Sequence, residues 1–64
     1  MPYHYYVVDG ALPVRVDEDT LEALLLHRDG SHEPVDAYKT VTDGREITEA
    51  EFNKFWDEHP YHGD

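Results

Sequence analysis

The chain has 64 residues, no cysteine, and fifteen Asp and Glu side chains against five Lys and Arg, which gives a formal net charge of -10. This length predicts a single domain, residues 1–64, with one small core. The lack of cysteine rules out disulfides and thiolate metal sites, and the negative field disfavours direct binding to nucleic acid or to anionic membranes.

The apolar runs of the sequence are short. Leu24–Leu26, for example, is far below the roughly 20 residues that a membrane-spanning helix needs. The first residues, MPYH, carry no basic segment of the kind that begins a secretory signal. We therefore expect a soluble, cytoplasmic protein that does not enter the membrane.

The first two predicted strands form a hairpin. Residues 3–8, YHYYVV, are aromatic or β-branched and are followed by Asp9-Gly10, a pair suited to a tight turn. In residues 11–16, apolar side chains then alternate with others. Pro13 cannot donate a hydrogen bond within a sheet, so we expect this strand to leave Pro13 unpaired or to lie at the sheet edge.

Residues 20–29 fit two structures. Good helix formers fill Leu21–Arg28, and Asp19 with Glu22 could form a capping box. However, Asp29-Gly30 is a second turn signal, and such a helix would have only about two turns, below the length at which isolated helices are stable. We therefore favour a second hairpin, with strands at about 22–28 and 31–35.

The C-terminal segment predicts a helix over about 49–58. Thr48 is a suitable N-cap, Glu51 completes a capping box, and Ile47 is placed to pack on the first turn. Phe52, Phe55 and Trp56 form one apolar stripe. Before this helix, residues 36–43 are expected to form a loop or a single helical turn, anchored on the sheet by Tyr38 and Val41. The predicted fold is α+β: an antiparallel sheet of three or four strands, built from two hairpins, with one C-terminal helix packed on one face.

Histidines near both ends suggest a metal site as an alternative function. The tripeptide Pro-Tyr-His occurs at residues 2–4 and again at 60–62, and His4, His59 and His62 could converge on one ion if the termini were neighbours. A repeated tripeptide is also expected by chance in this composition, and a histidine after a helix interacts favourably with the helix dipole. We therefore expect no cofactor.

No residue pattern predicts catalysis. The sole serine, Ser31, lies in a turn next to His32 rather than in a recognisable triad. The glycines form no phosphate-binding motif, and a domain of this size rarely encloses a substrate cavity. We expect a non-enzymatic protein.

The distinctive property of the sequence is its acidity. Two groups of carboxylates could engage a basic protein surface, together with tyrosines of the first strand, because tyrosine is enriched at interfaces. The candidate residues are Asp17, Glu18, Asp19 and Glu22, then Glu49, Glu51, Asp57 and Glu58, and finally Tyr3 and Tyr5.

Acidity of this kind points to a protein-interaction module. Carboxylates three and four apart on a helix are roughly 5–6 Å from one another, comparable with the spacing of nucleic-acid phosphates. In size and charge only, the chain resembles the small acidic proteins of phages and mobile elements that inhibit or regulate nucleic-acid-binding proteins. Acidity that serves only solubility, a histidine-based metal-binding accessory protein and a structural homodimer remain the alternatives.

Overall fold

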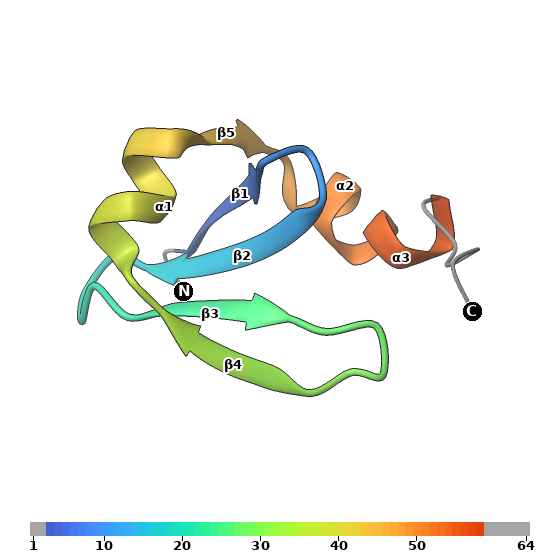
Figure 1. The fold of residues 1–64 in the computed structure, drawn as a ribbon, viewed down its shortest axis with the longest axis horizontal. Coiled ribbons are helices and arrows are strands. Elements are labelled where there is room, and N and C mark those ends of the chain that lie inside the picture. The colour runs from blue at the N-terminus through green and yellow to red at the C-terminus, as the bar shows by residue number, and fades with distance from the viewer. Residues whose placement is uncertain (1–2, 59–64) are drawn as a thin grey trace.

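The computed structural model describes residues 3–58 and shows one antiparallel sheet with short helices, which confirms the predicted α+β class (Figure 1). The strands are β1 (Tyr3–Val8), β2 (Leu12–Asp17), β3 (Ala23–Leu26), β4 (His32–Val35) and β5 (Gly44–Ile47). The helices are α1 (Ala37–Asp43), α2 (Glu49–Asn53) and α3 (Phe55–Glu58). The strand order is β4-β3-β2-β1-β5. The described part of the chain therefore has five strands rather than the three or four expected.

The β1–β2 hairpin forms where it was predicted. Asp9 and Gly10 adopt φ angles of 57° and 69°, and the Ala11 N–H donates to the Val8 carbonyl at 3.1 Å. Of the two alternatives expected for Pro13, the structure has the unpaired position and not the sheet edge, because β2 is central in the sheet, Pro13 is fully buried and it has no pairing partner in β3. Its missing N–H is tolerated because the ladder with β3 begins only at Val14.

Residues 20–29 contain a strand rather than a helix, as favoured. β3 pairs with β2 on one side and with β4 on the other, but it is shorter than predicted. The capping box considered for Asp19 does not form. Instead, the Asp17 carboxylate accepts hydrogen bonds from the backbone N–H groups of Asp19 and Thr20, and Leu21 has a φ of 60°. These contacts close a tight loop between β2 and β3.

Two elements were not predicted: helix α1, which is longer than one turn, and strand β5. Asp36 caps α1 by accepting from the N–H groups of Tyr38 and Lys39. α1 connects β4, at one edge of the sheet, to β5, at the opposite edge, and so crosses one sheet face. At the junction, a Cβ built on Gly44 would lie 2.5 Å from the Thr40 carbonyl oxygen, so this position has no room for a side chain.

The predicted C-terminal helix is confirmed at its start but is interrupted. Thr48 and Glu51 form the capping box. The chain then leaves helical geometry at Lys54, which has φ -100° and ψ 2°, and α3 follows as one further turn. Phe52 and Phe55 are buried and Trp56 is half-buried, as the apolar stripe predicted.

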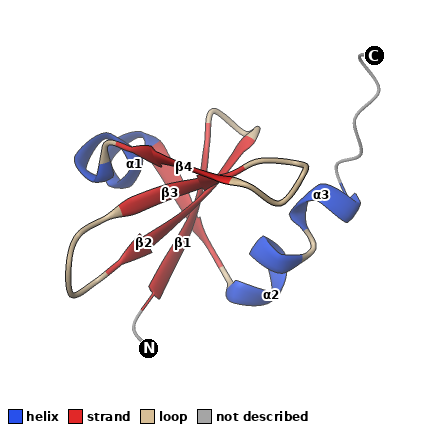
Figure 2. Cartoon of the chain, turned by 90° about the horizontal axis from the view of Figure 1, so that it is seen from below, coloured by secondary structure: helices blue, strands red, loops and turns tan. Residues whose placement is uncertain are grey.

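Each face of the sheet carries an apolar cluster. On one face, α2 and α3 pack Phe52 and Phe55 against Val7 and Ile47. On the other, Val14, Val16 and Ala23 pack with neighbours that include Ala37 at the start of α1. Figures 1 and 2 show α1 and the α2–α3 pair on opposite sides of the sheet. The expectation of a helix on only one face was therefore wrong.

Candidate functional site

Most acidic side chains lie on the exterior. Among those whose burial is described, only Asp17 is half-buried and the others are exposed. We call Asp17, Glu18, Asp19 and Glu22 the loop cluster, and Glu49, Glu51, Asp57 and Glu58 the helix cluster. The side chain of Glu58 lies outside the described part of the structure. The β2–β3 loop and α2 lie on opposite sides of the start of β1, so the two clusters form separate patches (Figures 1 and 2).

Three of these carboxylates also have local structural roles. Asp17 closes the β2–β3 loop, and Glu18 binds His4. The Thr48 N–H donates to the Glu51 carboxylate at 2.9 Å. This backbone bond, and to a lesser extent a bond with the Thr48 side chain, lowers the pKa of Glu51. Asp19, Glu22 and Asp57 remain as exposed carboxylates without such a role in the described structure. They are the best positions for testing charge without disturbing the fold.

His4 links three segments of the chain. Its Nδ1 lies 2.9 Å from a Glu46 carboxylate oxygen on β5, and its Nε2 contacts the Glu18 carboxylate. These hydrogen bonds raise the pKa of His4, and the bond to Glu46 has the largest effect. Because a carboxylate accepts at both ring nitrogens, the arrangement favours the doubly protonated imidazolium ring.

Of the three proposed metal ligands, only His4 lies within the described residues. His59 and His62 lie outside the described residues, and within residues 3–58 no three His, Asp or Glu side chains are arranged to hold a metal ion. His4 itself uses both nitrogens for carboxylates, whereas a metal ligand needs a free lone pair.

Tyr3 and Tyr5 are half-buried beside α2 rather than fully exposed. The Tyr5 ring packs on Phe52 with a centroid separation of 4.8 Å, and the Arg15 guanidinium lies 4.6 Å from the centre of the Tyr3 ring. Burial is the main cause that raises the pKa of Tyr5, and the negative charge of Glu49 raises it further. These residues line an open hollow of about 470 Å³ on the face that α2 covers.

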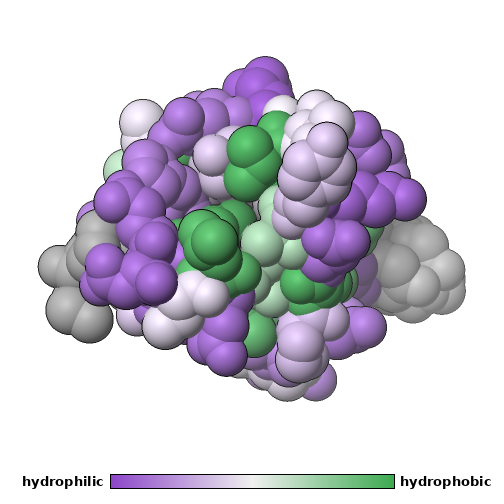
Figure 3. Space-filling view, turned by 90° about the vertical axis from the view of Figure 1, so that its left-hand side faces the viewer, coloured by the Kyte–Doolittle hydropathy of each residue, from purple (hydrophilic) through white to green (hydrophobic). Residues whose placement is uncertain are grey.

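The sequence did not reveal an apolar groove beside α1, which we call the α1 groove. Its volume is about 190 Å³. Its apolar lining is Val8, Leu12, Val14, Leu25 and Val35, and its polar lining is Asp9, Asp36, Lys39 and Thr40. On the left-hand side of the view in Figure 1, Figure 3 shows patches of apolar surface with hydrophilic surface around them.

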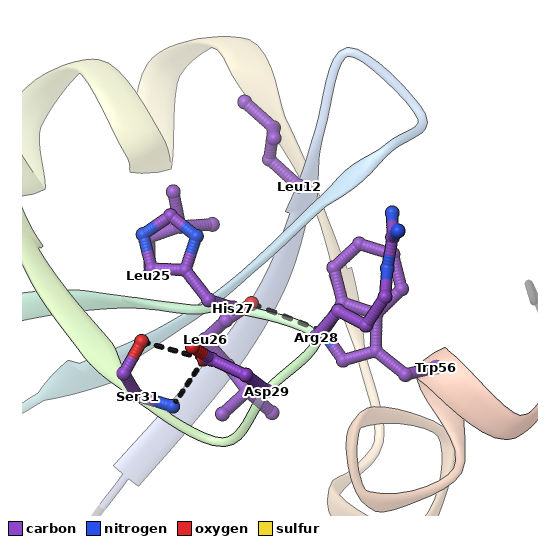
Figure 4. Close-up of a pocket in the computed structure, with 8 residues that line it drawn as sticks. All are labelled: Leu12, Leu25, Leu26, His27, Arg28, Asp29, Ser31 and Trp56. Carbon is purple, nitrogen blue, oxygen red and sulfur yellow. Dashed lines mark hydrogen bonds between the residues drawn. The ribbon is translucent and has the colours of Figure 1, made fainter. Parts of the chain in front are cut away.

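A second hollow, of about 600 Å³ and wide open to solvent, adjoins the α1 groove. Leu12 and Leu25 line both. The Trp56 indole N–H donates to the Leu26 carbonyl at 3.1 Å, and Arg28 lies over the Trp56 ring at 5.1 Å (Figure 4). The Ser31 hydroxyl donates to Asp29 at 2.7 Å, a bond that belongs to the β3–β4 turn.

The residue that α1 buries is not one that the sequence predicted. Tyr38 and Val41 were expected to anchor this segment, yet they are 80% and 50% exposed, and Thr40 is buried in their place. The Thr40 hydroxyl donates to the Asp36 carbonyl at 2.9 Å, so its burial leaves no unpaired polar group.

Comparison of the chain with protein-family models, with curated proteins and with solved structures finds no match. Within the described residues, no helix is long and apolar enough to span a membrane.

Proposed function

We propose that this protein is a small, non-enzymatic interaction module that docks its acidic exterior on the basic surface of a partner protein. A nucleic-acid-binding protein is the partner class that best fits this charge, because its functional surface is built to attract phosphates. In this role the chain would occupy a surface that otherwise binds nucleic acid, and so would inhibit or regulate the partner.

The observation that carries this proposal is the exposure of the carboxylates. Within the described residues, His4 pairs with Glu18 and Glu46, and His27 pairs with Glu33, while the carboxylates of Asp19, Glu22 and Asp57 are exposed. With a net charge of -10 on 64 residues, the exterior attracts cationic surfaces and speeds their association.

The proposal is tested by competition with DNA. A fluorescently labelled duplex is bound by each of several basic DNA-binding proteins, and the displacement of the duplex by this chain is measured at increasing salt. We expect displacement from at least one of them, weakening steeply as salt screens the charges. If the chain displaces DNA from none of the proteins, or displaces it equally at low and high salt, the proposal is wrong.

Charge variants separate specific docking from general acidity. Asp19→Asn with Glu22→Gln removes two charges from the loop cluster, and Glu49→Gln with Asp57→Asn removes two from the helix cluster. The control, Asp43→Asn with Asp64→Asn, removes two charges from outside both clusters and leaves the His4 and His27 ion pairs intact. The proposal requires that at least one cluster variant displaces the DNA duplex less well than the control variant does. Equal losses in all three would mean that only net charge matters.

A further inference from the structure

The α1 groove has the dimensions of a site for side chains rather than for a small molecule. Its volume of about 190 Å³ lies below the roughly 300–1,000 Å³ of small-molecule pockets. Its floor is formed by residues of four neighbouring strands, β1 to β4, and Val35 at the end of β4 leads into α1. Leu12 is 39% exposed, so the groove leaves apolar surface in contact with water that a partner side chain could cover.

The charged residues around the groove are mainly acidic. Asp9 and Asp36 contribute two carboxylates, against the single ammonium group of Lys39. The backbone of the loop cluster passes close to one end of the groove: β3 and β4 pair at Ala23 and Val35, so the backbones of the next residues outward, Glu22 and Asp36, lie near each other. The apolar floor thus lies within the negative field of the protein.

This charge selects among the possible occupants. A second copy of the chain would bring another net charge of -10 against the same surface, which mutual repulsion opposes. An apolar segment without charge would gain nothing from Asp9 and Asp36. A segment with apolar side chains and flanking basic side chains matches both the floor and the rim.

We propose that the α1 groove is the docking site for an amphipathic, basic segment of the partner protein. An aliphatic or aromatic side chain of that segment enters the groove over Leu12 and Leu25, and flanking Lys or Arg side chains meet Asp9 and Asp36. This inference rests on the proposed function and makes it more specific: the acidic exterior attracts the partner, and the groove holds its anchor residue. Anchors that fill a desolvated pocket carry most of the affinity of an interface.

The test uses synthetic amphipathic peptides with the full-length chain. The first peptide contains only leucine and lysine, the second has serine in place of leucine, and the third has glutamate in place of lysine. Binding is followed by amide chemical shifts of the labelled protein and by the fluorescence of Trp56, the only tryptophan in the chain. We expect the Leu/Lys peptide to shift amides of β2, β3 and α1, and each of the other two to bind about tenfold more weakly or worse, the loss typical of a removed anchor.

Matched variants assign the binding to the groove. Leu12→Lys places a charge on the groove floor, whereas Val41→Lys makes the same kind of change at an exposed apolar residue of α1 outside the groove. Asp9→Asn with Asp36→Asn removes the rim charge but retains side chains suited to the turn and the helix cap. We expect Leu12→Lys and the double Asn variant each to weaken binding of the Leu/Lys peptide about tenfold, and Val41→Lys to leave it unchanged.

The outcomes distinguish this inference from the proposed function. If Leu12→Lys binds like Val41→Lys, or the serine peptide binds as well as the leucine peptide, the groove is not the docking site, although the acidic exterior could still dock on a basic protein. If Leu12→Lys weakens binding but neither salt nor neutralisation of the clusters does, the proposed function is wrong, and with it the basic character of the partner segment.

Other occupants are detected in the same experiment. Concentration-dependent sedimentation that Leu12→Lys abolishes would assign the groove to a second copy of the chain. Peptide affinity that rises in the full-length Tyr61→Ala variant would assign it to the chain's own C-terminal residues. Either result would overturn the assignment to a partner protein.

Discussion

Replacing Gly44 by alanine tests how α1 is attached to the sheet. The φ of Gly44 is -88°, a value open to any residue, so the constraint at this position is space. A Cβ here would lie 2.5 Å from the Thr40 carbonyl oxygen, 3.2 Å from Val8 Cγ2 and 3.3 Å from Tyr6 Cβ. The carbonyl belongs to the helix backbone and cannot rotate away, so the end of α1 must move off β1.

The expected cost follows from two opposing effects. Inserting a methyl group into a packed site costs about 1–3 kcal/mol, and the contact with a backbone atom places Gly44→Ala toward the upper end of that range. The lower entropy of the unfolded alanine chain offsets about 0.4–1 kcal/mol. We therefore expect a net loss of about 2 kcal/mol, or roughly 8–16 °C in Tm for a domain of this size. A 64-residue domain has about 3–10 kcal/mol of stability, so the variant should still fold.

The measurement is urea unfolding followed by Trp56 fluorescence, with thermal unfolding by circular dichroism. Gly30→Ala is the control, because Gly30 has a φ of 93° but a Cβ at this position would meet no atom within 4 Å beyond the adjacent residues. That substitution should cost about 1 kcal/mol through backbone strain alone. If Gly44→Ala is as stable as Gly30→Ala, α1 is not held against β1 as described, and the shape of the α1 groove is also wrong.

Three further predictions concern single contacts. Thr48→Ala removes the capping box with Glu51 and should cost about 1 kcal/mol in urea unfolding; an unchanged midpoint would mean that the box adds no stability. Because the pKa of His4 is raised, its contribution is fully present below pH 6.5, the unfolded value, and is lost as pH rises through the folded-state pKa. His4→Gln should therefore lower Tm at acidic pH more than at alkaline pH, and a pH-independent loss would contradict the pairing. Trp56→Phe removes the hydrogen bond to the Leu26 carbonyl and should cost about 1 kcal/mol by circular dichroism; no loss would show that water replaces the indole N–H.

The elements that the sequence predicted depend on short-range interactions. The capping box of Thr48 and Glu51 lies within one helical turn, and the Asp9-Gly10 turn joins strands that are adjacent in the chain. By contrast, β5 forms a strand because it pairs with the edge of β1, and β1 lies about forty residues earlier in the sequence. Its residues, GREI, have no clear alternation of apolar and polar side chains. Sequence patterns alone could not identify this pairing.

The candidate site was predictable only in its charge. The exposure of Asp19, Glu22 and Glu49 follows from composition, because a core this small cannot bury so many carboxylates. The link from His4 to Glu18 and Glu46 could not be predicted, since it depends on β5 pairing with β1. The α1 groove was hidden for the same reason, because it exists only where α1 crosses the sheet to reach β5.

Charge and shape have different roles in the proposed interaction, and neither replaces the other. The exposed carboxylates act over distances up to about a Debye length, roughly 8 Å at physiological salt, so they raise the rate of encounter with any basic surface but discriminate poorly among such surfaces. The α1 groove acts only at contact, where its apolar floor can distinguish a partner with a suitable anchor residue from one with basic side chains alone. A protein that relied on charge alone would bind many basic proteins weakly. Because Asp9 and Asp36 border the apolar floor of the groove, one docked segment can use both features at once.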